Sequence, residues 1–209
     1  MQNFRKSRTQ QNSPRVWIQI LAPVIGYLFL IWLIRAGLLR FTSAPYETAA
    51  ALSAACLFPP VLLFYQLKWK KECARTDRAV PGTGREAVLW ILAALAMAAL
   101  SVLCCGIDEG TRSLPVLAVT CLLAPVSEEI LYRGQFIGRG SKVLSAPVLI
   151  LLSALLFAGA HGFDKSLLAA FPAGLLLGWF YLREERITGI AVIHCSANIL
   201  ISAASCILG

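Results

Sequence analysis

Long apolar runs separated by short polar stretches dominate the chain. There are seven such runs, at about 16–34, 48–67, 87–106, 114–136, 146–161, 167–182 and 187–208. A helix crosses a bilayer with about 20 apolar residues, so each run is near the required length. We therefore predict an all-α fold, a polytopic transmembrane helix bundle of about seven spans. Prolines at 23, 59, 60, 125 and 172 predict kinks, which a bilayer tolerates if neighbouring helices satisfy the freed carbonyl groups.

Composition supports this pattern and argues against a water-soluble globule. Of 209 residues, 58% are apolar and 14% charged, whereas soluble domains contain about 25% charged residues. The net charge of +8 could suit nucleic acid, but the basic residues lie between apolar runs without interleaved aromatic residues, so we expect no nucleic-acid partner. The seven cysteines are an odd number without CxxC spacing, which argues against a disulfide framework or a zinc knuckle.

The pattern divides the chain into three segments. Residues 1–15 are polar and basic and are predicted to be a disordered cytoplasmic tail. Residues 16–84 hold two transmembrane helices and a basic cytoplasmic loop, and residues 85–209 hold a five-helix core. The first apolar run is too long for a signal peptide and is interpreted as a retained span. Gly174 and Gly178 form a GxxxG pattern, which is typical of close helix packing.

Basic residues in the loops predict the orientation. If the N-terminus is cytoplasmic, 15 of the 19 basic residues fall on the cytoplasmic side and four on the other side, Arg35, Arg40, Arg112 and Lys165. Cytoplasmic loops carry an excess of Lys and Arg, so this split favours seven spans with the N-terminus inside. We expect an integral, multi-pass protein of a prokaryotic cytoplasmic membrane.

Few polar residues interrupt the apolar runs, and they are candidates for function because ionisable groups at membrane depth are costly. They are Glu128, Glu129 and Arg133 in the fourth run, His161 at the end of the fifth, and His194 and Asn198 in the seventh. These include both histidines of the chain.

Helical spacing assigns these groups different places. Glu129 and Arg133 are four residues apart and should form an ion pair, which leaves Glu128 to point elsewhere, toward the bundle interior. Phe157 and His161 share a face, as do His194 and Asn198. If the fourth helix ends near Lys142, Glu128 and His161 lie at matching depth, about 21 Å from the inner ends of their helices.

The three patterns together resemble a known family. Residues 128–133 form an EExxxR motif, 157–161 FxxxH and 194–198 HxxxN, in this order on three spans. They resemble the glutamic intramembrane proteases that include the CAAX prenyl endopeptidases of the Rce type and bacterial bacteriocin-processing and immunity relatives. The resemblance covers about residues 85–209.

The resemblance implies a role for each of these residues. Glu128 would be the general base for a hydrolytic water that His161 helps to hold, and His194 with Asn198 would stabilise the oxyanion. Glu129 and Arg133 would orient the site, with Phe157 packing beside it. No cofactor is implied, and the substrate would be a membrane-tethered protein or peptide: a prenylated tail, a leader peptide or a C-terminal sorting helix.

Other interpretations remain open at this level. Glu129 and Arg133 could only lock helices together, His161 could cap its helix next to Gly162, and His194 with Asn198 could be interhelical glue. Glu128, His161 and His194 could instead ligate a catalytic zinc, although no HExxH spacing is present. The alternative functions are a non-catalytic bacteriocin-immunity factor and a small proton-coupled transporter that uses Glu128.

Overall fold

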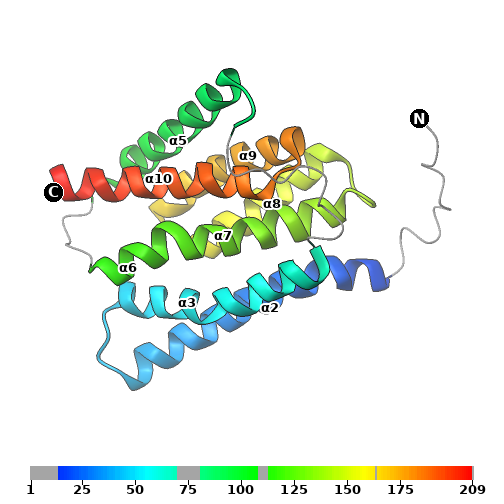
Figure 1. Ribbon diagram of the computed structural model, residues 1–209. Coiled ribbons are helices and arrows are strands. Elements are labelled where there is room, and N and C mark those ends of the chain that lie inside the picture. Colours follow the sequence, from blue (N-terminus) through cyan, green and yellow to red (C-terminus); the bar gives the residue numbers. More distant parts are fainter. Residues whose placement is uncertain (1–13, 70–80, 108–112, 163, 209) are drawn as a thin grey trace, which may run out of the picture.

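The computed structural model describes residues 14–69, 81–107, 113–162 and 164–208, so the predicted N-terminal tail lies almost wholly outside the described residues. The described residues form an antiparallel bundle of helices without strands (Figure 1). The elements are α2 (Pro14–Phe41), α3 (Tyr46–Phe64), η1 (Tyr65–Trp69), α5 (Gly84–Cys105), α6 (Leu114–Ala118), η2 (Val119–Leu123), α7 (Ala124–Glu128), η3 (Glu129–Gly138), α8 (Ala146–His161), α9 (Lys165–Glu184) and α10 (Ile187–Leu208).

The seven predicted runs are all helical, and the bundle architecture is confirmed. Six of the described helices are long and apolar enough to cross a membrane. The exception is α8, whose 16 residues reach about 24 Å at 1.5 Å per residue, less than the roughly 30 Å of a bilayer core. In contrast, α2 is longer than predicted, since its 28 residues continue through Arg35 and Arg40.

The fourth helix is continuous from Leu114 to Gly138 but alternates between α and π geometry. The π segments are η2, directly before α7, and the ten-residue η3. Pro125 lies at the start of α7 and has no N–H, and π segments are frequent where a helix carries a functional site. Arg139 and Gly140 continue this helix beyond η3, and Lys142 lies in the turn that follows, so the helix ends close to the Lys142 that we predicted.

A proline in α2 explains one contact between distant helices. Pro23 cannot donate to the carbonyl oxygen of residue 19, four residues earlier. The side-chain amide of Gln135 in η3 donates to that oxygen instead, and Gln135 itself is fully buried. A neighbouring helix thus satisfies a freed carbonyl group, as predicted for prolines within a membrane.

Glycines of α9 allow its close approach to α8. A Cβ atom on Gly174 would lie 2.9 Å from the Cα atom of Ala154, and one on Gly178 would lie 3.4 Å from side-chain atoms of Ile137 and Ile150. The close packing predicted from the GxxxG pattern is therefore present. The helix begins at the N-cap Asp164, whose side chain accepts from Ser166 N.

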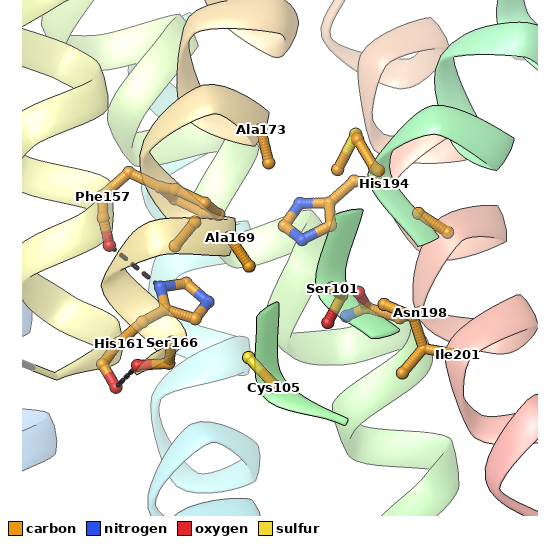
Figure 2. A pocket seen from close by; sticks show the side chains of 13 residues that line it. Ser101, Cys105, Phe157, His161, Ser166, Ala169, Ala173, His194, Asn198 and Ile201 are labelled. Atoms are coloured by element: carbon orange, nitrogen blue, oxygen red, sulfur yellow. Dashed lines mark hydrogen bonds between the residues drawn. The ribbon is translucent and has the colours of Figure 1, made fainter. Parts of the chain in front are cut away.

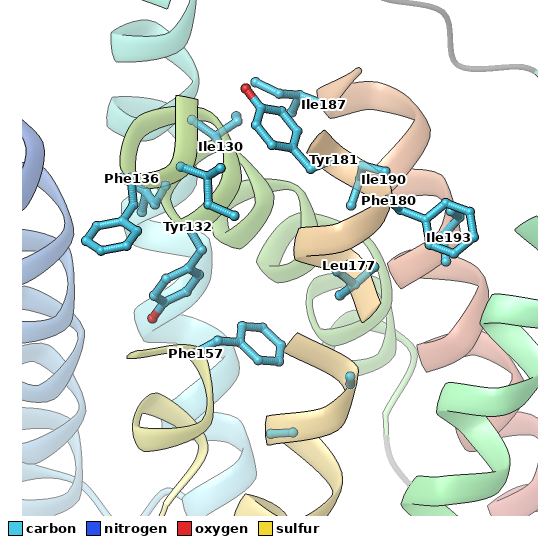
Figure 3. Packing of buried hydrophobic residues seen from close by; sticks show 14 of the residues in the cluster. Ile130, Tyr132, Phe136, Phe157, Leu177, Phe180, Tyr181, Ile187, Ile190 and Ile193 are labelled. Atoms are coloured by element: carbon cyan, nitrogen blue, oxygen red, sulfur yellow. The ribbon is translucent and has the colours of Figure 1, made fainter. Parts of the chain in front are cut away.

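The apolar core joins the fourth helix to α8, α9 and α10. Figure 3 shows side chains of η3, α9 and α10 gathered around this core, with Phe157 of α8 beneath them. Large apolar side chains on the outside of the bundle are exposed, among them Trp32, Ile91 and Leu155, as expected where a helix faces lipid rather than water. Helix α5 packs against α9 and α10, while α2 and α3 cover the other side of the fourth helix.

Candidate active site

A buried carboxylate on the fourth helix contacts both an arginine and a histidine. Glu129 is fully buried, and its Oε1 atom accepts a 3.0 Å hydrogen bond from Nη1 of Arg133. The same oxygen lies 2.8 Å from Nδ1 of His194 on α10. The ion pair predicted from the four-residue spacing is therefore present, and it also reaches the seventh helix, which the spacing did not indicate.

Arg133 connects this network to α8 and α9. Its Nη2 atom donates a 3.2 Å hydrogen bond to the carbonyl oxygen of Gly174, and its guanidinium lies 4.7 Å from the centre of the Phe157 ring. Arg133 is fully buried, and an uncompensated buried charge would cost several kcal/mol. The carboxylate, the carbonyl and the aromatic face supply this compensation.

The contact with Glu129 decides which nitrogen of His194 is available. A carboxylate accepts hydrogen bonds, so we assign the proton of Nδ1 to the bond with Glu129. The remaining nitrogen, Nε2, lies 3.9 Å from Oε2 of Glu128. Whether Nε2 accepts or donates a hydrogen bond depends on the protonation of the ring. A neutral His194 accepts at Nε2, and an imidazolium donates there.

Glu128 has a different environment from its neighbour. Its side chain is 19% exposed, whereas that of Glu129 is 0% exposed. Its Oε2 atom lies 3.9 Å from Nε2 of His194, which is itself buried. Glu128 therefore lies toward the bundle interior, as predicted.

A cavity of about 120 Å³ lies between α5, α8, α9 and α10 (Figure 2). Four of the predicted site residues line it: Phe157, His161, His194 and Asn198. The two helix faces that we expected to converge therefore share one cavity. Glu128 does not line it, and the carboxylate approaches it only through its 3.9 Å contact with His194.

His161 is the last residue of α8 and is exposed. Its Nδ1 atom lies 2.9 Å from the carbonyl oxygen of Phe157, and because a carbonyl can only accept, we assign the proton to Nδ1. The bond to the last turn agrees with a capping role, but it leaves Nε2 as an acceptor beside the cavity. The ring centres of His161 and Phe157 are 4.5 Å apart.

Asn198 bonds to a backbone carbonyl group that Pro125 leaves without its helical donor. Its side-chain amide donates a 2.9 Å hydrogen bond to the carbonyl oxygen of Thr120. Within the helix, this carbonyl could accept only from residue 124 or residue 125. Ala124 donates to the carbonyl oxygen of Val119, and Pro125 has no N–H, so the Thr120 carbonyl has no donor from its own helix. Since an amide group has two N–H donors, one donor of Asn198 remains for the cavity. This contact fits the interhelical glue interpretation and leaves a catalytic role open.

Sequence reasoning did not identify Ser101, Cys105 and Ser166, which also line the cavity. The hydroxyl of Ser166 donates to the carbonyl oxygen of His161, and its place two residues after an N-cap Asp was a signal in the sequence. Cys195, the residue after His194, does not line the cavity, and its sulfur lies 3.8 Å from the carbonyl oxygen of Leu122.

The predicted zinc ligands were Glu128, His161 and His194. Among the described residues, no three His, Cys, Asp or Glu side chains come together in a way that could hold a metal ion. His161 and His194 line the cavity, whereas Glu128 does not.

Part of the chain is similar to a known protein family. Residues 110–200 match the family model described as "Type II CAAX prenyl endopeptidase Rce1-like". The matched segment contains all three motifs and confirms the resemblance predicted from them. Neither the curated proteins nor the solved structures give a match.

Proposed function

From the Rce1-like segment at residues 110–200, we propose that this integral membrane protein is an endopeptidase that uses a glutamate-activated water. One observation supports the mechanism most directly. Glu129 holds Nδ1 of His194, so the histidine presents its other nitrogen to Glu128 from within a cavity large enough for water. At about 30 Å³ per molecule, the cavity has room for about four waters.

In the proposed reaction, Glu128 removes a proton from water while the water oxygen attacks the scissile carbonyl carbon. Nε2 of His161 accepts the second hydrogen bond of that water and fixes its position. The carbon–nitrogen bond then breaks, and Glu128 returns the proton to the leaving amine. The products are a carboxylic acid and an amine, which become a carboxylate and an ammonium when the acid passes its proton to the amine, and no covalent enzyme intermediate is formed.

The oxyanion would be stabilised by His194 and Asn198. Because Nδ1 of His194 donates to Glu129, Nε2 can donate to an oxyanion only if the ring is an imidazolium. The free N–H of the Asn198 amide supplies a second donor, and such donors contribute about 2.7–4 kcal/mol each in acyl-transfer enzymes.

Substrate binding has one structural requirement. The carboxylate of Glu128 must turn from the bundle interior toward the water in the cavity. Catalytic hydrogen bonds are often long or poorly aligned in a free enzyme and tighten when substrate binds, and the partial exposure of Glu128 leaves its side chain room to turn. The fully buried Glu129 has no such freedom, which supports a reactive role for Glu128 and an orienting role for Glu129.

The test is cleavage by the purified protein in proteoliposomes. Three tethered peptides serve as probes: one prenylated at a C-terminal cysteine, one leader peptide and one C-terminal transmembrane helix. We expect Glu128→Gln to lower the cleavage rate by about 10²–10⁴-fold, whereas Glu185→Gln, at an exposed carboxylate between α9 and α10, leaves it unchanged.

Two results would count against this function. Cleavage that survives both Glu128→Gln and His161→Ala would exclude the mechanism. If the wild-type protein cleaves none of the three peptides and Glu128→Gln retains the cellular phenotype, the protein would instead be a non-catalytic binding protein.

A further inference from the structure

The cavity leads from the buried part of the site to one end of the bundle. Three of its lining residues lie at helix ends: Cys105 is the last residue of α5, His161 is the last residue of α8, and Ser166 lies in the first turn of α9. Cys105 and His161 are exposed, whereas Phe157 and His194 are buried. The mouth of the cavity is therefore at the end of the bundle where α5 and α8 finish.

The two ends of the bundle differ in charge. The mouth end contains the turn between α2 and α3, the start of α6 and the C-terminus of α10 (Figure 1). Among the described residues, three basic ones belong to it: Arg35, Arg40 and Lys165. Arg133 belongs to neither end because it is buried in the ion pair. The other described basic residues lie at the opposite end: Arg15, Lys68, Arg85, Arg139, Lys142, Arg183 and Arg186.

We propose that the cavity opens on the non-cytoplasmic face of the membrane, and that the substrate is a membrane-anchored polypeptide whose scissile bond lies on that face. Segments rich in Lys and Arg remain in the cytoplasm, so the end with few basic residues, where the mouth lies, faces away from it. The second part of this inference rests on the proposed function. It favours a sorting segment that follows a membrane span over a cytoplasmic prenylated tail.

The lining of the cavity adds a restriction on the substrate. Alanines form much of its wall, three on α9 and one on α10: Ala169, Ala170, Ala173 and Ala197. At about 120 Å³ the space is small for a folded segment, so the chain must enter extended, with small side chains beside the scissile bond. A transmembrane helix would have to unwind at its end before cleavage.

Native cysteines allow the first part to be tested on the whole protein. A membrane-impermeant, charged maleimide is added to spheroplasts and to inverted vesicles, and the modification of each cysteine is measured by mass spectrometry. We expect Cys105 to react at least tenfold faster in spheroplasts than in inverted vesicles. Cys206, exposed near the end of α10, should show the same preference.

Two further positions calibrate the result. Ser141→Cys, at an exposed turn of the opposite end, should react only in inverted vesicles. Cys56 is exposed in the middle of α3, faces lipid and should react in neither preparation. Labelling of Cys105 from the same side as Ser141→Cys would overturn the proposal. So would a Cys105 that reacts no faster than Cys56, because the mouth would then be closed to water.

A pair of reporters tests the substrate. Each carries one membrane span and the same Ala- and Ser-rich segment, placed on the non-cytoplasmic side in one and on the cytoplasmic side in the other. We expect the wild-type protein to cleave only the first, and Glu128→Gln to cleave neither. Cleavage of only the cytoplasmic reporter would overturn the proposed access but retain the peptidase. Failure to cleave either, with Cys105 labelled as expected, would refute the peptidase and retain the access.

Discussion

The two histidines of this protein show two ways of holding a polar group in a membrane bundle. His194 is buried, and its ring is tied to a carboxylate that also holds Arg133. His161 is exposed at a helix end, and its ring is tied only to a backbone carbonyl of its own helix. The same side chain therefore belongs to a charged interior network in one case and to the mouth of a cavity in the other.

The two histidines therefore lie in regions with different roles, one that stabilises the fold and one that is available for chemistry. The network around Glu129 satisfies charges that would otherwise destabilise the bundle, because one carboxylate, one arginine and one histidine are removed from water together. The cavity side depends on groups that retain a free donor or acceptor. We therefore expect substitutions in the interior network to affect folding and cleavage together, and substitutions near the mouth to affect cleavage alone.

The largest effect is expected when the interior network loses its cation. Arg133→Met leaves Glu129 buried without its arginine and should lower the free energy of unfolding by about 3–5 kcal/mol. Thermal and denaturant unfolding in detergent would measure this loss. The control is Arg40→Met at an exposed position of α2, which should stay within about 0.5 kcal/mol of wild type. Equal stability of the two variants would show that the network contributes nothing.

Replacing each histidine by alanine sharpens the comparison. Both variants should cleave the test peptides at least 10²-fold more slowly. Only His194→Ala should also destabilise the protein, by about 1–3 kcal/mol, since it leaves Glu129 without a partner from α10. A His161→Ala variant that unfolds as readily as His194→Ala would contradict the division between mouth and interior.

At residue 174, α9 packs so closely against α8 and Arg133 that we expect no side chain to fit. Gly174→Ala would bring a Cβ atom within 2.9 Å of the backbone of Ala154, and overpacking of this kind costs about 1–3 kcal/mol. Gly159→Ala, on α8 with nothing within 4 Å of the new atom, is the matched control. It should be neutral or stabilising by up to about 1 kcal/mol. Unfolding measurements on the pair separate steric conflict from the general effect of removing a glycine.

A smaller effect is expected far from either histidine, where Gln135 satisfies the carbonyl group freed by Pro23. Gln135→Leu should cost about 1 kcal/mol of unfolding free energy. Pro23→Ala supplies the missing N–H, so Gln135→Leu should cost less in a Pro23→Ala background. Identical costs in the two backgrounds would show that the proline does not create the need for Gln135.

The smallest effect concerns the turn beside the mouth. Hydrogen bonds from Ser166 lower the pKa of Asp164 below its ordinary value of 3.8. A lowered carboxyl pKa means that the charged form stabilises the folded state. This stabilisation is present above pH 3.8 and is lost as the pH falls through the lowered value. Asp164→Asn should remove this acid dependence and change stability little at neutral pH, as unfolding curves at several pH values would show.

Local features of the fold and site were predictable because helix geometry alone sets them. The seven helical runs, the ion pair of Glu129 with Arg133 and the tight contact at Gly174 follow from residue spacing within one helix and from side-chain size. The bounds of α8 were also predicted, but the continuation of α2 to Phe41 and the π segments of the fourth helix were not. Where a helix ends and where it adopts π geometry depend on how the packed helices meet, which the spacing within one apolar run does not set.

The sequence by itself determined that this is a bundle of apolar helices and which few polar residues its interior must satisfy. Tertiary structure decided how they are satisfied. In the folded bundle, His194 and Arg133 contact the same oxygen of Glu129. Asn198 donates to the carbonyl group of Thr120. Glu128 lies outside the cavity that His161 lines. Spacing along a helix fixes a shared face, but partners 65 or 78 residues apart in the chain are chosen only when the helices pack against one another.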